Sequence, residues 1–249
     1  MSQDIQQFDK YKEKGAYHWK EMRSGIKRFN AGLAARYEIS KGIIFRNLSS
    51  PNIIVDIGCG DGFFSATIAE RYRSANIVGY DFDETAIRLA NEKKEELGYK
   101  NLSFHRGDAF EYKDVSLIVA TDVIEHLNEP EDFMRRSFSM LVEGGYLFMS
   151  TPIRCKEFPD DKYHVHEFFY KELEDFCKSF KFEMVEHCSS HDYCFLEQYG
   201  KRFNLLGMGK MRFYKYYYNS LAIYLNKNVF EGMECGLPTM QYILLRRVC

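Results

Sequence analysis

The sequence predicts an α/β fold in which a mostly parallel sheet carries helices on both faces. Three observations support this prediction. Short apolar stretches alternate with amphipathic stretches from residue 53 to residue 187, which is the order of strands and helices in a doubly wound sheet. A glycine-rich turn at residues 58–62 joins the first apolar stretch to the helix that follows it. Acidic residues follow several of the apolar stretches, at the edge where open α/β sheets bind ligands.

The individual elements follow from the apolar stretches and the residues that flank them. The expected strands cover residues 53–55, 76–80, 102–105, 116–121, 146–150, 182–187 and 240–248. The expected helices cover residues 63–72, 86–97, 130–141 and 171–180. Asp83 or Thr85 can cap the second of these helices, and Gly98 stops it. Right-handed crossovers between parallel strands then fix most of the topology.

Two regions lie outside this alternation. Residues 1–45 look helical, contain the chain's only tryptophan in Tyr17-His18-Trp19, and are expected to form an N-terminal helical cap. Residues 46–249 are expected to form the main domain. Within it, residues 191–236 separate the last two strands, and because a hairpin needs only about two to five residues, this stretch is expected to be an insertion.

Composition narrows the class of protein. The chain has 249 residues, is 45% hydrophobic and carries a formal net charge of −2. These values suit one domain with a sizeable core and give no electrostatic reason to expect nucleic acid. No apolar stretch approaches the roughly 20 residues of a transmembrane helix, and residues 1–14 lack the apolar segment of a secretory signal. The seven cysteines have no CxxC spacing, which predicts reduced thiols in a cytoplasm and argues against zinc. We therefore expect a cytoplasmic protein with no membrane partner, and the oligomeric state is left open.

The most informative stretch is residues 53–62, which read Ile-Ile-Val-Asp-Ile-Gly-Cys-Gly-Asp-Gly. Glycine permits a positive φ and a close approach to the backbone, and the following helix presents free N–H groups. The turn is therefore expected to bind a ligand. The dinucleotide-binding motif G-x-G-x-x-G has its third glycine one place later, where this chain has Phe63. The carboxylate of Asp56 suits a cation or an amine better than a pyrophosphate.

The order acid-x-Gly-x-Gly-x-Gly resembles motif I of the class I S-adenosylmethionine (SAM) methyltransferases. The resemblance implies a Rossmann-like, doubly wound sheet of seven strands, mostly parallel with the last strand antiparallel, and SAM as the cofactor. It also implies that the turn packs on the amino-acid and ribose portions of SAM, and that the acid helps to hold the ammonium group. The residues expected to bind SAM here are Asp56, Gly58, Cys59, Gly60, Gly62 and Phe63. The alternative is a tight turn without a ligand, but three alternating glycines and an acid exceed what a turn requires.

Asp81 ends the second expected strand, 25 residues after Asp56. The resemblance implies that an acid at this place accepts hydrogen bonds from both ribose hydroxyls. The alternative is a helix-capping role, but Asp83 and Thr85 already supply caps.

Gly107-Asp108-Ala109-Phe110 follows the third expected strand. The resemblance implies that the acid accepts from the adenine amino group and that the next backbone N–H contacts the ring, and Phe110 is a candidate wall for that ring. The further residues expected at the cofactor are Phe82, Asp108, Ala109 and Thr121.

The segment Thr121 to Leu127 reads Thr-Asp-Val-Ile-Glu-His-Leu and resembles the segment after the fourth strand in ubiquinone-biosynthesis-like and sugar O-methyltransferases. Two interpretations stay open. In one, His126 is a general base that takes a proton from an acceptor hydroxyl. In the other, Asp122, Glu125 and His126 line a divalent metal site, because residues three and four apart share a helical face. Carboxylates with an imidazole suit magnesium, manganese or iron.

Two later histidines, His164 and His166, extend this hypothesis. Alternate residues of an extended segment point the same way, and their loop follows the fifth strand. The pattern is similar to that of small-RNA 2′-O-methyltransferases, which pair Glu-x-x-Glu-His with a later histidine, although Asp122 here replaces the first glutamate. The candidate catalytic residues are His126, Glu125 and His166. The candidate ligands for Mg²⁺ or Mn²⁺ are Asp122, Glu125, His126, His164 and His166. A third interpretation is that these side chains only cap a helix or pack.

The resemblance implies a SAM-dependent methyltransferase, and we expect it to O-methylate a small polar acceptor such as a sugar, a surface-polysaccharide precursor or a phosphorylated metabolite. The cap is expected to close over SAM. The aromatic-basic cluster at residues 212–218 is interpreted as a lid that also packs on the core, with a base-stacking surface or a plain amphipathic helix as alternatives. Also open are a metal-free methyltransferase, RNA 2′-O-methylation and a SAM-binding regulator without turnover. Phe63 argues against a nicotinamide oxidoreductase.

Overall fold

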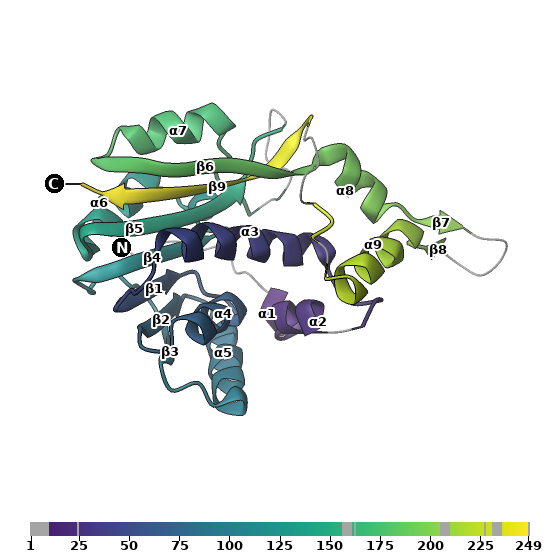
Figure 1. Cartoon of the computed structure of the whole chain (residues 1–249), viewed down its shortest axis with the longest axis horizontal. Coiled ribbons are helices and arrows are strands. Elements are labelled where there is room, and N and C mark those ends of the chain that lie inside the picture. The colour runs from purple at the N-terminus through teal and green to yellow at the C-terminus, as the bar shows by residue number, and fades with distance from the viewer. Residues whose placement is uncertain are drawn as a thin grey trace.

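The computed structural model describes residues 10–23, 25–155, 161, 163–204, 210–226, 228–230 and 236–248. A seven-stranded sheet forms its centre, with the strand order β3-β2-β1-β4-β5-β9-β6 (Figure 1). The strands are β1 (Ile53–Ile57), β2 (Asn76–Asp81), β3 (Leu102–Arg106), β4 (Val115–Thr121), β5 (Leu141–Pro152), β6 (Phe182–Asp192) and β9 (Pro238–Arg247). The neighbouring strands β3, β2, β1, β4 and β5 pair in parallel, whereas β9 is antiparallel to both β5 and β6. The expected fold, including the antiparallel last strand, is confirmed.

Helices cover both faces of the sheet because the central strands are apolar on both faces. The helices of the doubly wound part are α3 (Ala31–Asn47), α4 (Phe63–Arg71), α5 (Glu84–Leu97), α6 (Pro130–Met140) and α7 (Tyr170–Lys178). In β1, Ile54 belongs to the core beneath α3, α4 and α5. The next residue, Val55, belongs to the core beneath α6 and α7. Both side chains are fully buried.

Several element boundaries follow local rules that the sequence already shows. The carboxylate of Asp83 accepts hydrogen bonds from the backbone N–H groups of Thr85 and Ala86 at 2.7 and 3.1 Å and so begins α5. Gly98 ends that helix in the left-handed region, with φ of 72°. Pro130 stands at the first position of α6, where its missing N–H is not needed.

Two strands are longer than expected. Strand β5 begins at Leu141 rather than at residue 146, and β6 runs on to Asp192 rather than ending at residue 187. Both strands pair with β9, and the long β6–β9 register extends the second strand as far as Asp192 and Pro238. Residues 144 and 145, which read as a break in the sequence, lie inside β5, where the register shifts against β4. Leu141 pairs with Val115, the ladder resumes at Tyr146, and Gly144 has a positive φ of 75°, so the two glycines form an irregularity inside the strand instead of ending it.

The N-terminal region contains α1 (Lys10–Lys14), α2 (Tyr17–Arg23) and α3. The first nine residues of the expected cap lie outside the described part of the chain. Figure 1 places α1 and α2 beyond the carboxyl ends of the parallel strands, while α3 runs across one face of the sheet. The first two helices thus lie at the edge where a ligand is expected.

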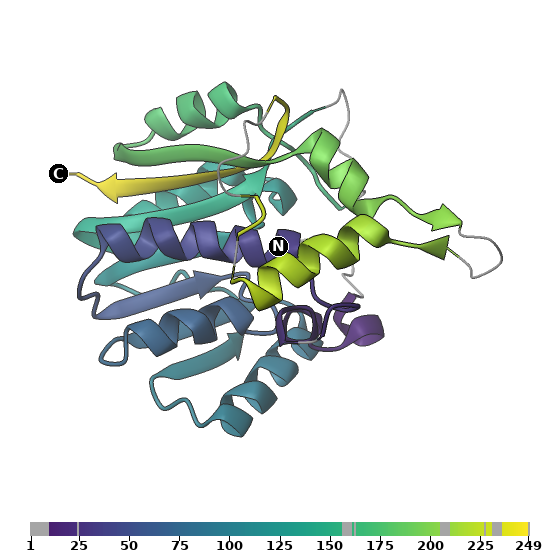
Figure 2. The ribbon, with the colours of Figure 1, turned by 45° about the vertical axis from the view of Figure 1, so that its right-hand side comes forward.

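We call the segment between β6 and β9 the arm. Its described residues form four elements: α8 (Tyr193–Gly200), β7 (Phe203–Asn204), β8 (Lys210–Met211) and α9 (Phe213–Tyr224). Strands β7 and β8 form a small antiparallel pair that extends away from the sheet (Figure 2). The arm packs on the start of α3 through a separate apolar cluster that includes Phe29, Ala31, Phe195 and Tyr199. Residues 205–209, 227 and 231–235 of the expected insertion lie outside the described residues. None of the helices that the structure describes is both long and apolar enough to cross a membrane.

Candidate active site

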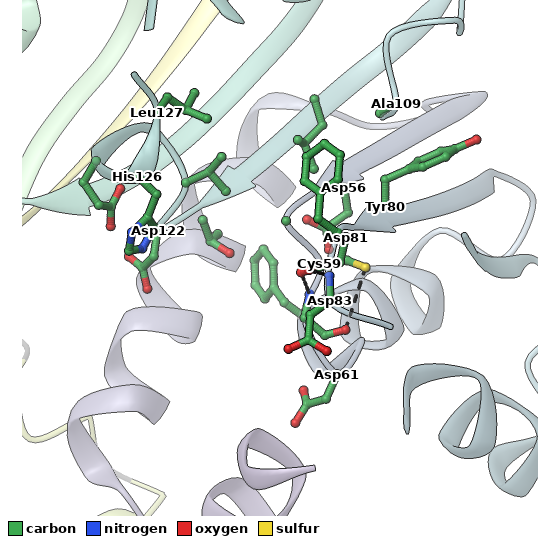
Figure 3. A pocket seen from close by; sticks show the side chains of 18 of the residues that line it. Asp56, Cys59, Asp61, Tyr80, Asp81, Asp83, Ala109, Asp122, His126 and Leu127 are labelled. Atoms are coloured by element: carbon green, nitrogen blue, oxygen red, sulfur yellow. Dashed lines mark hydrogen bonds between the residues drawn. The ribbon is translucent and has the colours of Figure 1, made fainter. Parts of the chain in front are cut away.

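A cavity of about 1600 Å³ lies at the carboxyl ends of β1, β2 and β4. It is lined by most of the residues that the sequence indicates: Asp56, Gly58, Cys59, Gly60, Phe63, Asp81, Phe82, Asp108, Ala109, Thr121, Asp122, Glu125, His126 and His164. Gly62 and His166 are not among its lining residues. Figure 3 shows Asp56 and Asp81 on one side of this space, and Asp122 and His126 on the other.

The glycine turn is held in shape by its own surroundings. Gly58, Gly60 and Gly62 have φ values of 72°, 56° and 75°. A Cβ at Gly58 would come within 2.6 Å of Val123 Cγ2, and a Cβ at Gly60 would collide with the Tyr11 hydroxyl. Glycine is therefore needed at both positions, because the backbone is left-handed there and because Val123 and Tyr11 pack directly against it.

Asp56 presents an unsatisfied acceptor toward the cavity. Its side chain is buried, Oδ2 accepts a hydrogen bond from the Ser65 hydroxyl, and Oδ1 has no partner among the described residues. Burial raises the pKa of Asp56 to about 7, with Ser65 opposing the shift and the charge of Asp81 adding to it. An orphaned buried carboxylate oxygen is costly unless a donor meets it, so this site fits the ammonium group of an amino-acid ligand.

Asp81 is held in a fixed orientation at the end of β2. Its Oδ2 accepts from the backbone N–H of Gly60 at 2.9 Å and its Oδ1 from that of Asp83 at 2.8 Å. Each carboxylate oxygen has a further lone pair, so the group fits a vicinal diol such as that of ribose. Burial raises the pKa of Asp81, and its backbone hydrogen bonds oppose this shift. The cap of α5 is Asp83, not Asp81.

The expected adenine side contains an ion pair that the sequence did not indicate. Asp108 Oδ1 accepts from the backbone N–H of Phe110 at 2.9 Å, and Oδ2 lies 2.8 Å from Arg136 Nη2. The Arg136 guanidinium lies 3.8 Å from the centre of the Phe110 ring. Ala109 is buried beside them, whereas Phe82 is 52% exposed. Asp108 thus reaches the cavity with its carboxylate already paired.

Asp61 fastens the N-terminal helices to the glycine turn, and sequence reasoning missed it. Its fully buried carboxylate accepts from the backbone N–H of His18 at 3.0 Å and lies 2.9 Å from His18 Nδ1. Trp19 Nε1 donates to the Asp61 carbonyl at 2.8 Å. Tyr11 and Tyr17, whose ring centres are 5.3 Å apart, line the cavity from these helices. The sequence offered two signals for this contact: an acid inside the glycine run, and the pair of hydrogen-bond donors His18-Trp19 in the expected N-terminal cap.

The opposite wall begins where β4 ends. Asp122 follows the strand with a positive φ of 56° and donates its backbone N–H to the Ser150 carbonyl at 2.8 Å. Its carboxylate forms an ion pair with Arg36 of α3. Asp122 is therefore directed at an arginine rather than into a cluster of metal ligands, and no pattern in the sequence indicated Arg36.

Glu125, His126 and His164 come together on this wall. One potential ligand atom from each lies within 4.8 Å of the other two. Glu125 is fully buried, its Oε2 accepts from the Thr151 hydroxyl at 3.0 Å, and its Oε1 has no partner among the residues described. Burial raises the pKa of Glu125 well above its usual value, and the nearby charge of Asp122 adds to the shift.

Both histidines of this cluster use Nδ1 for a hydrogen bond. His126 Nδ1 lies 2.9 Å from the Tyr163 carbonyl, and His164 Nδ1 lies 2.5 Å from Glu167 Oε1. A carbonyl or a carboxylate at Nδ1 favours the Nδ1–H tautomer, which makes Nε2 the basic nitrogen. Burial lowers the pKa of His126, so the neutral ring dominates near pH 7.

His166 does not join the cluster. Its Nε2 lies 3.3 Å from Glu172 Oε1, and its ring packs on Phe168 with centres 4.4 Å apart. The expectation that both later histidines share a direction is wrong. The physical reason is that the backbone N–H groups of Val165 and His166 both donate to the Glu125 carbonyl, at 2.8 and 3.2 Å. This loop is folded onto the site rather than extended.

Comparison with known proteins agrees with this geometry. A family profile described as a methyltransferase domain matches residues 48–219. A ubiquinone biosynthesis O-methyltransferase of Cupriavidus pinatubonensis is 29% identical over 152 residues, which is 59% of each chain. The match thus spans about three fifths of that relative's length.

Solved structures show the same fold. Phosphoethanolamine N-methyltransferase 2 of Haemonchus contortus, in complex with S-adenosyl-L-methionine, matches with a TM-score of 0.62 and 12% identity over 96% of this chain and 58% of that chain. Geranyl diphosphate methyltransferase, in complex with GPP and sinefungin, matches with a TM-score of 0.60 and 13% identity over 86% and 77%. Because the family profile covers more than half of the chain and the fold agrees with it, the protein belongs to the class I SAM-dependent methyltransferases.

Proposed function

We propose that this protein transfers a methyl group from SAM to a hydroxyl of a small polar acceptor, with the help of a divalent cation such as Mg²⁺ or Mn²⁺. The observation that carries the proposal is the cluster of Glu125, His126 and His164 on the wall opposite the glycine turn. The acceptors that we favour are sugars, surface-polysaccharide precursors and phosphorylated metabolites.

The size and lining of the cavity support a second ligand beside SAM. Its volume of about 1600 Å³ exceeds the roughly 300–1,000 Å³ of a typical single-ligand pocket. The half that faces the cluster is lined by polar groups, among them Tyr17, Arg36, Asp122 and Tyr163. Such a wall offers hydroxyl, guanidinium and carboxylate groups that can hydrogen-bond the hydroxyls of a polar acceptor.

The donor set of the cluster fits a divalent cation. Carboxylate and imidazole ligands suit magnesium, manganese and iron. Metal-bound histidines commonly donate their other ring N–H to a carbonyl or a carboxylate, and the Nδ1 partners of His126 and His164 are of those two kinds. The Oε1 of Glu125, which has no partner among the described residues, would supply a carboxylate ligand atom, because the charge of a bound cation would favour the ionised form that burial disfavours. A cation held here would act as a Lewis acid that lowers the pKa of the acceptor hydroxyl.

The chain's own residues then have distinct tasks. SAM supplies an electrophilic methyl group on a sulfonium. Asp56 holds the ammonium group of the cofactor and Asp81 its ribose, and the N-terminal helices, fastened by Asp61, cover the cavity and exclude water. The opposite wall holds the acceptor in line with the methyl group, so that alignment provides much of the catalysis.

Metal binding is tested directly by titrating Mn²⁺ into the purified chain and following bound Mn²⁺ by electron paramagnetic resonance. We expect one bound ion, lost in Glu125→Gln and His164→Ala. His166→Ala is the matched control, because His166 lies outside the cluster and pairs with Glu172. No bound ion in the wild type, or an equal loss in His166→Ala, contradicts the metal site.

A metal-free reaction is the second candidate, and the protonation state of His126 favours it. Burial lowers the pKa of His126, so its neutral ring can accept the acceptor's proton. Formation of S-adenosylhomocysteine, followed with a panel of acceptors in excess chelator, separates the candidates. Full turnover that His126→Ala abolishes supports the base, whereas turnover restored only by Mn²⁺ or Mg²⁺ supports the cation. Cofactor binding without turnover on any acceptor is the result expected of a regulator.

A further inference from the structure

The arm carries an exposed aromatic face with no partner in the described structure. Six residues in α9 and directly after it, which we call the aromatic stripe, are large, apolar and exposed: Phe213, Tyr214, Tyr217, Ile223, Tyr224 and Leu225. Tyr217, Tyr224 and Leu225 are 59%, 73% and 64% exposed. Phe213, Tyr217 and Tyr224 are four and seven residues apart, which places them on one side of α9. Contiguous exposed apolar surface of this kind marks a binding site.

The opposite side of α9 explains why this stripe is not needed for folding. Asn219 is fully buried and donates to the carbonyls of Ile26 and Phe29 at 2.7 and 2.6 Å. Tyr218 packs on the ring of Phe195, with centres 4.6 Å apart. The helix is therefore already anchored to the body of the protein by one face, and the stripe is the face that remains.

The same segment has an excess of basic residues. Residues 193–237 contain six lysines and arginines and three glutamates, in a chain whose total is 34 basic and 36 acidic residues. Lys201 and Arg202 are exposed, and within the described part of the chain neither they nor Arg212 and Lys215 take part in an ion pair. Burial, followed by the neighbouring charge of Arg212, lowers the pKa of Lys215. The arm therefore carries a net positive charge, which the acidic residues of the segment offset only in part.

A second basic site adjoins the far end of the stripe. Tyr224 lies against the loop of residues 25–28, in which Lys27 and Arg28 are exposed. At the other end, Lys201 Nζ lies 5.7 Å from the centre of the Phe203 ring, and that ring lies 6.4 Å from the ring of Phe213 in the stripe. Basic groups therefore flank the aromatic stripe at both ends of α9.

We propose that the aromatic stripe docks the protein on an anionic lipid surface. Aromatic and aliphatic side chains on one helical face, flanked by lysine and arginine, are the composition of helices that lie in the headgroup region. The arm lies beyond the same edge of the sheet as the cavity (Figures 1 and 2). Docking would therefore hold the cavity near the lipid surface. This inference does not depend on which acceptor is methylated.

Two other occupants fit the charges and shapes less well. A second copy that used the same face would bring two basic surfaces together, which is unfavourable. Single-stranded nucleic acid needs stacking platforms along a groove, whereas the stripe also contains the aliphatic side chains of Ile223 and Leu225, which offer no ring to a base.

The test is flotation of the purified full chain with vesicles of phosphatidylcholine alone and of phosphatidylcholine mixed with phosphatidylglycerol. We expect binding to the anionic vesicles only, and weaker binding at high salt because the charges are screened. Tyr217→Ser with Tyr224→Ser removes two exposed rings and should lower partitioning about tenfold or more. Lys201→Gln with Arg202→Gln should lower it about 25-fold, since each basic residue near an anionic surface contributes a factor of about five.

Matched controls separate docking from general changes. Lys100→Gln with Lys181→Gln removes two exposed charges elsewhere, and Leu97→Ser removes an exposed apolar side chain outside the arm; both should bind vesicles like the wild type. Circular dichroism checks that every variant is folded. The proposal is overturned by absence of binding, by equal binding to neutral vesicles, or by equal losses in the controls. It is also overturned if the stripe variants abolish a dimer seen by light scattering, or binding of a single-stranded oligonucleotide, while vesicles are not bound.

Discussion

Replacing Asp61 by alanine is predicted to release the N-terminal helices from the glycine turn. The change removes the two hydrogen bonds that the buried carboxylate accepts from His18, at 3.0 and 2.9 Å. It leaves the bond from Trp19 Nε1 in place, because that bond goes to the Asp61 backbone carbonyl. The variant therefore tests the side chain alone.

The size of the effect follows from the partners. A hydrogen bond to a charged group stabilises a fold by about 1.5–3 kcal/mol. The His18 side chain is partly exposed and can bond to water after release, so the lower value applies to each bond. The two bonds then contribute about 3 kcal/mol, and at about 1.4 kcal/mol per factor of ten the released state becomes roughly 150-fold more populated.

Trp19 reports this release, because it is the chain's only tryptophan and only 5% exposed, and its ring lies 5.0 Å from that of Phe63. We expect red-shifted emission, stronger quenching by acrylamide and weaker binding of S-adenosylhomocysteine. His18→Ala, which leaves the glycine turn unchanged, should act in the same direction. Lys20→Ala on the same helix is the control. Unchanged quenching in Asp61→Ala, or the same change in Lys20→Ala, would refute the reasoning.

Three further predictions rest on single side chains. Asp81→Ala should weaken S-adenosylhomocysteine binding about 100-fold in calorimetry, because two ribose hydrogen bonds to a carboxylate are lost; unchanged affinity contradicts the ribose assignment. Asn219→Ala should lower the free energy of unfolding by about 3 kcal/mol in urea, since its amide bridges the arm to residues 26 and 29; a loss below about 1 kcal/mol would show that these bonds are weak. Burial lowers the pKa of His191 to about 4, so between about pH 6.5 and 4 the unfolded chain binds the proton first and stability falls by about 2 kcal/mol from pH 8 to 5. His191→Asn, which tolerates the left-handed φ of 63°, should remove that part of the slope, and an unchanged slope would contradict this origin.

The strands and helices around the sheet could be predicted because local sequence signals mark where they begin and end. The apolar residues of β1, β2 and β4 are buried on both faces, and Asp83 and Gly98 mark the ends of α5. The length of β6 could not be predicted, because it depends on pairing with β9, which is distant in the sequence. The start of β5 could not be predicted either, because it depends on the pairing of Leu141 with Val115 of β4. The packing of the arm against α3 depends on the bonds of Asn219, and a buried asparagine inside a tyrosine-rich helix gives no sign of its partners.

The site divides in the same way. The spacing of the glycines and the position of Asp81 at the end of its strand predicted the side of the cavity that is lined by the glycine turn and Asp81. Arg36 could not be found, because it meets Asp122 across 86 residues of sequence and only through the packing of α3. His164 and His166 could not be told apart by spacing, since the two backbone bonds to the Glu125 carbonyl decide which one turns inward.

Helix α3 has a consequence for how the arm and the cavity communicate. Its first residue, Ala31, donates its backbone N–H to the Tyr199 hydroxyl of the arm at 3.1 Å. Five residues later, Arg36 forms the ion pair with Asp122 in the cavity wall. Only roughly 7.5 Å of helix separates these two points, and a helix of this length is stiff. We therefore expect a displacement of the arm to move Arg36 as well, so that contact at the arm would shift the ion pair between Arg36 and Asp122 in the cavity wall.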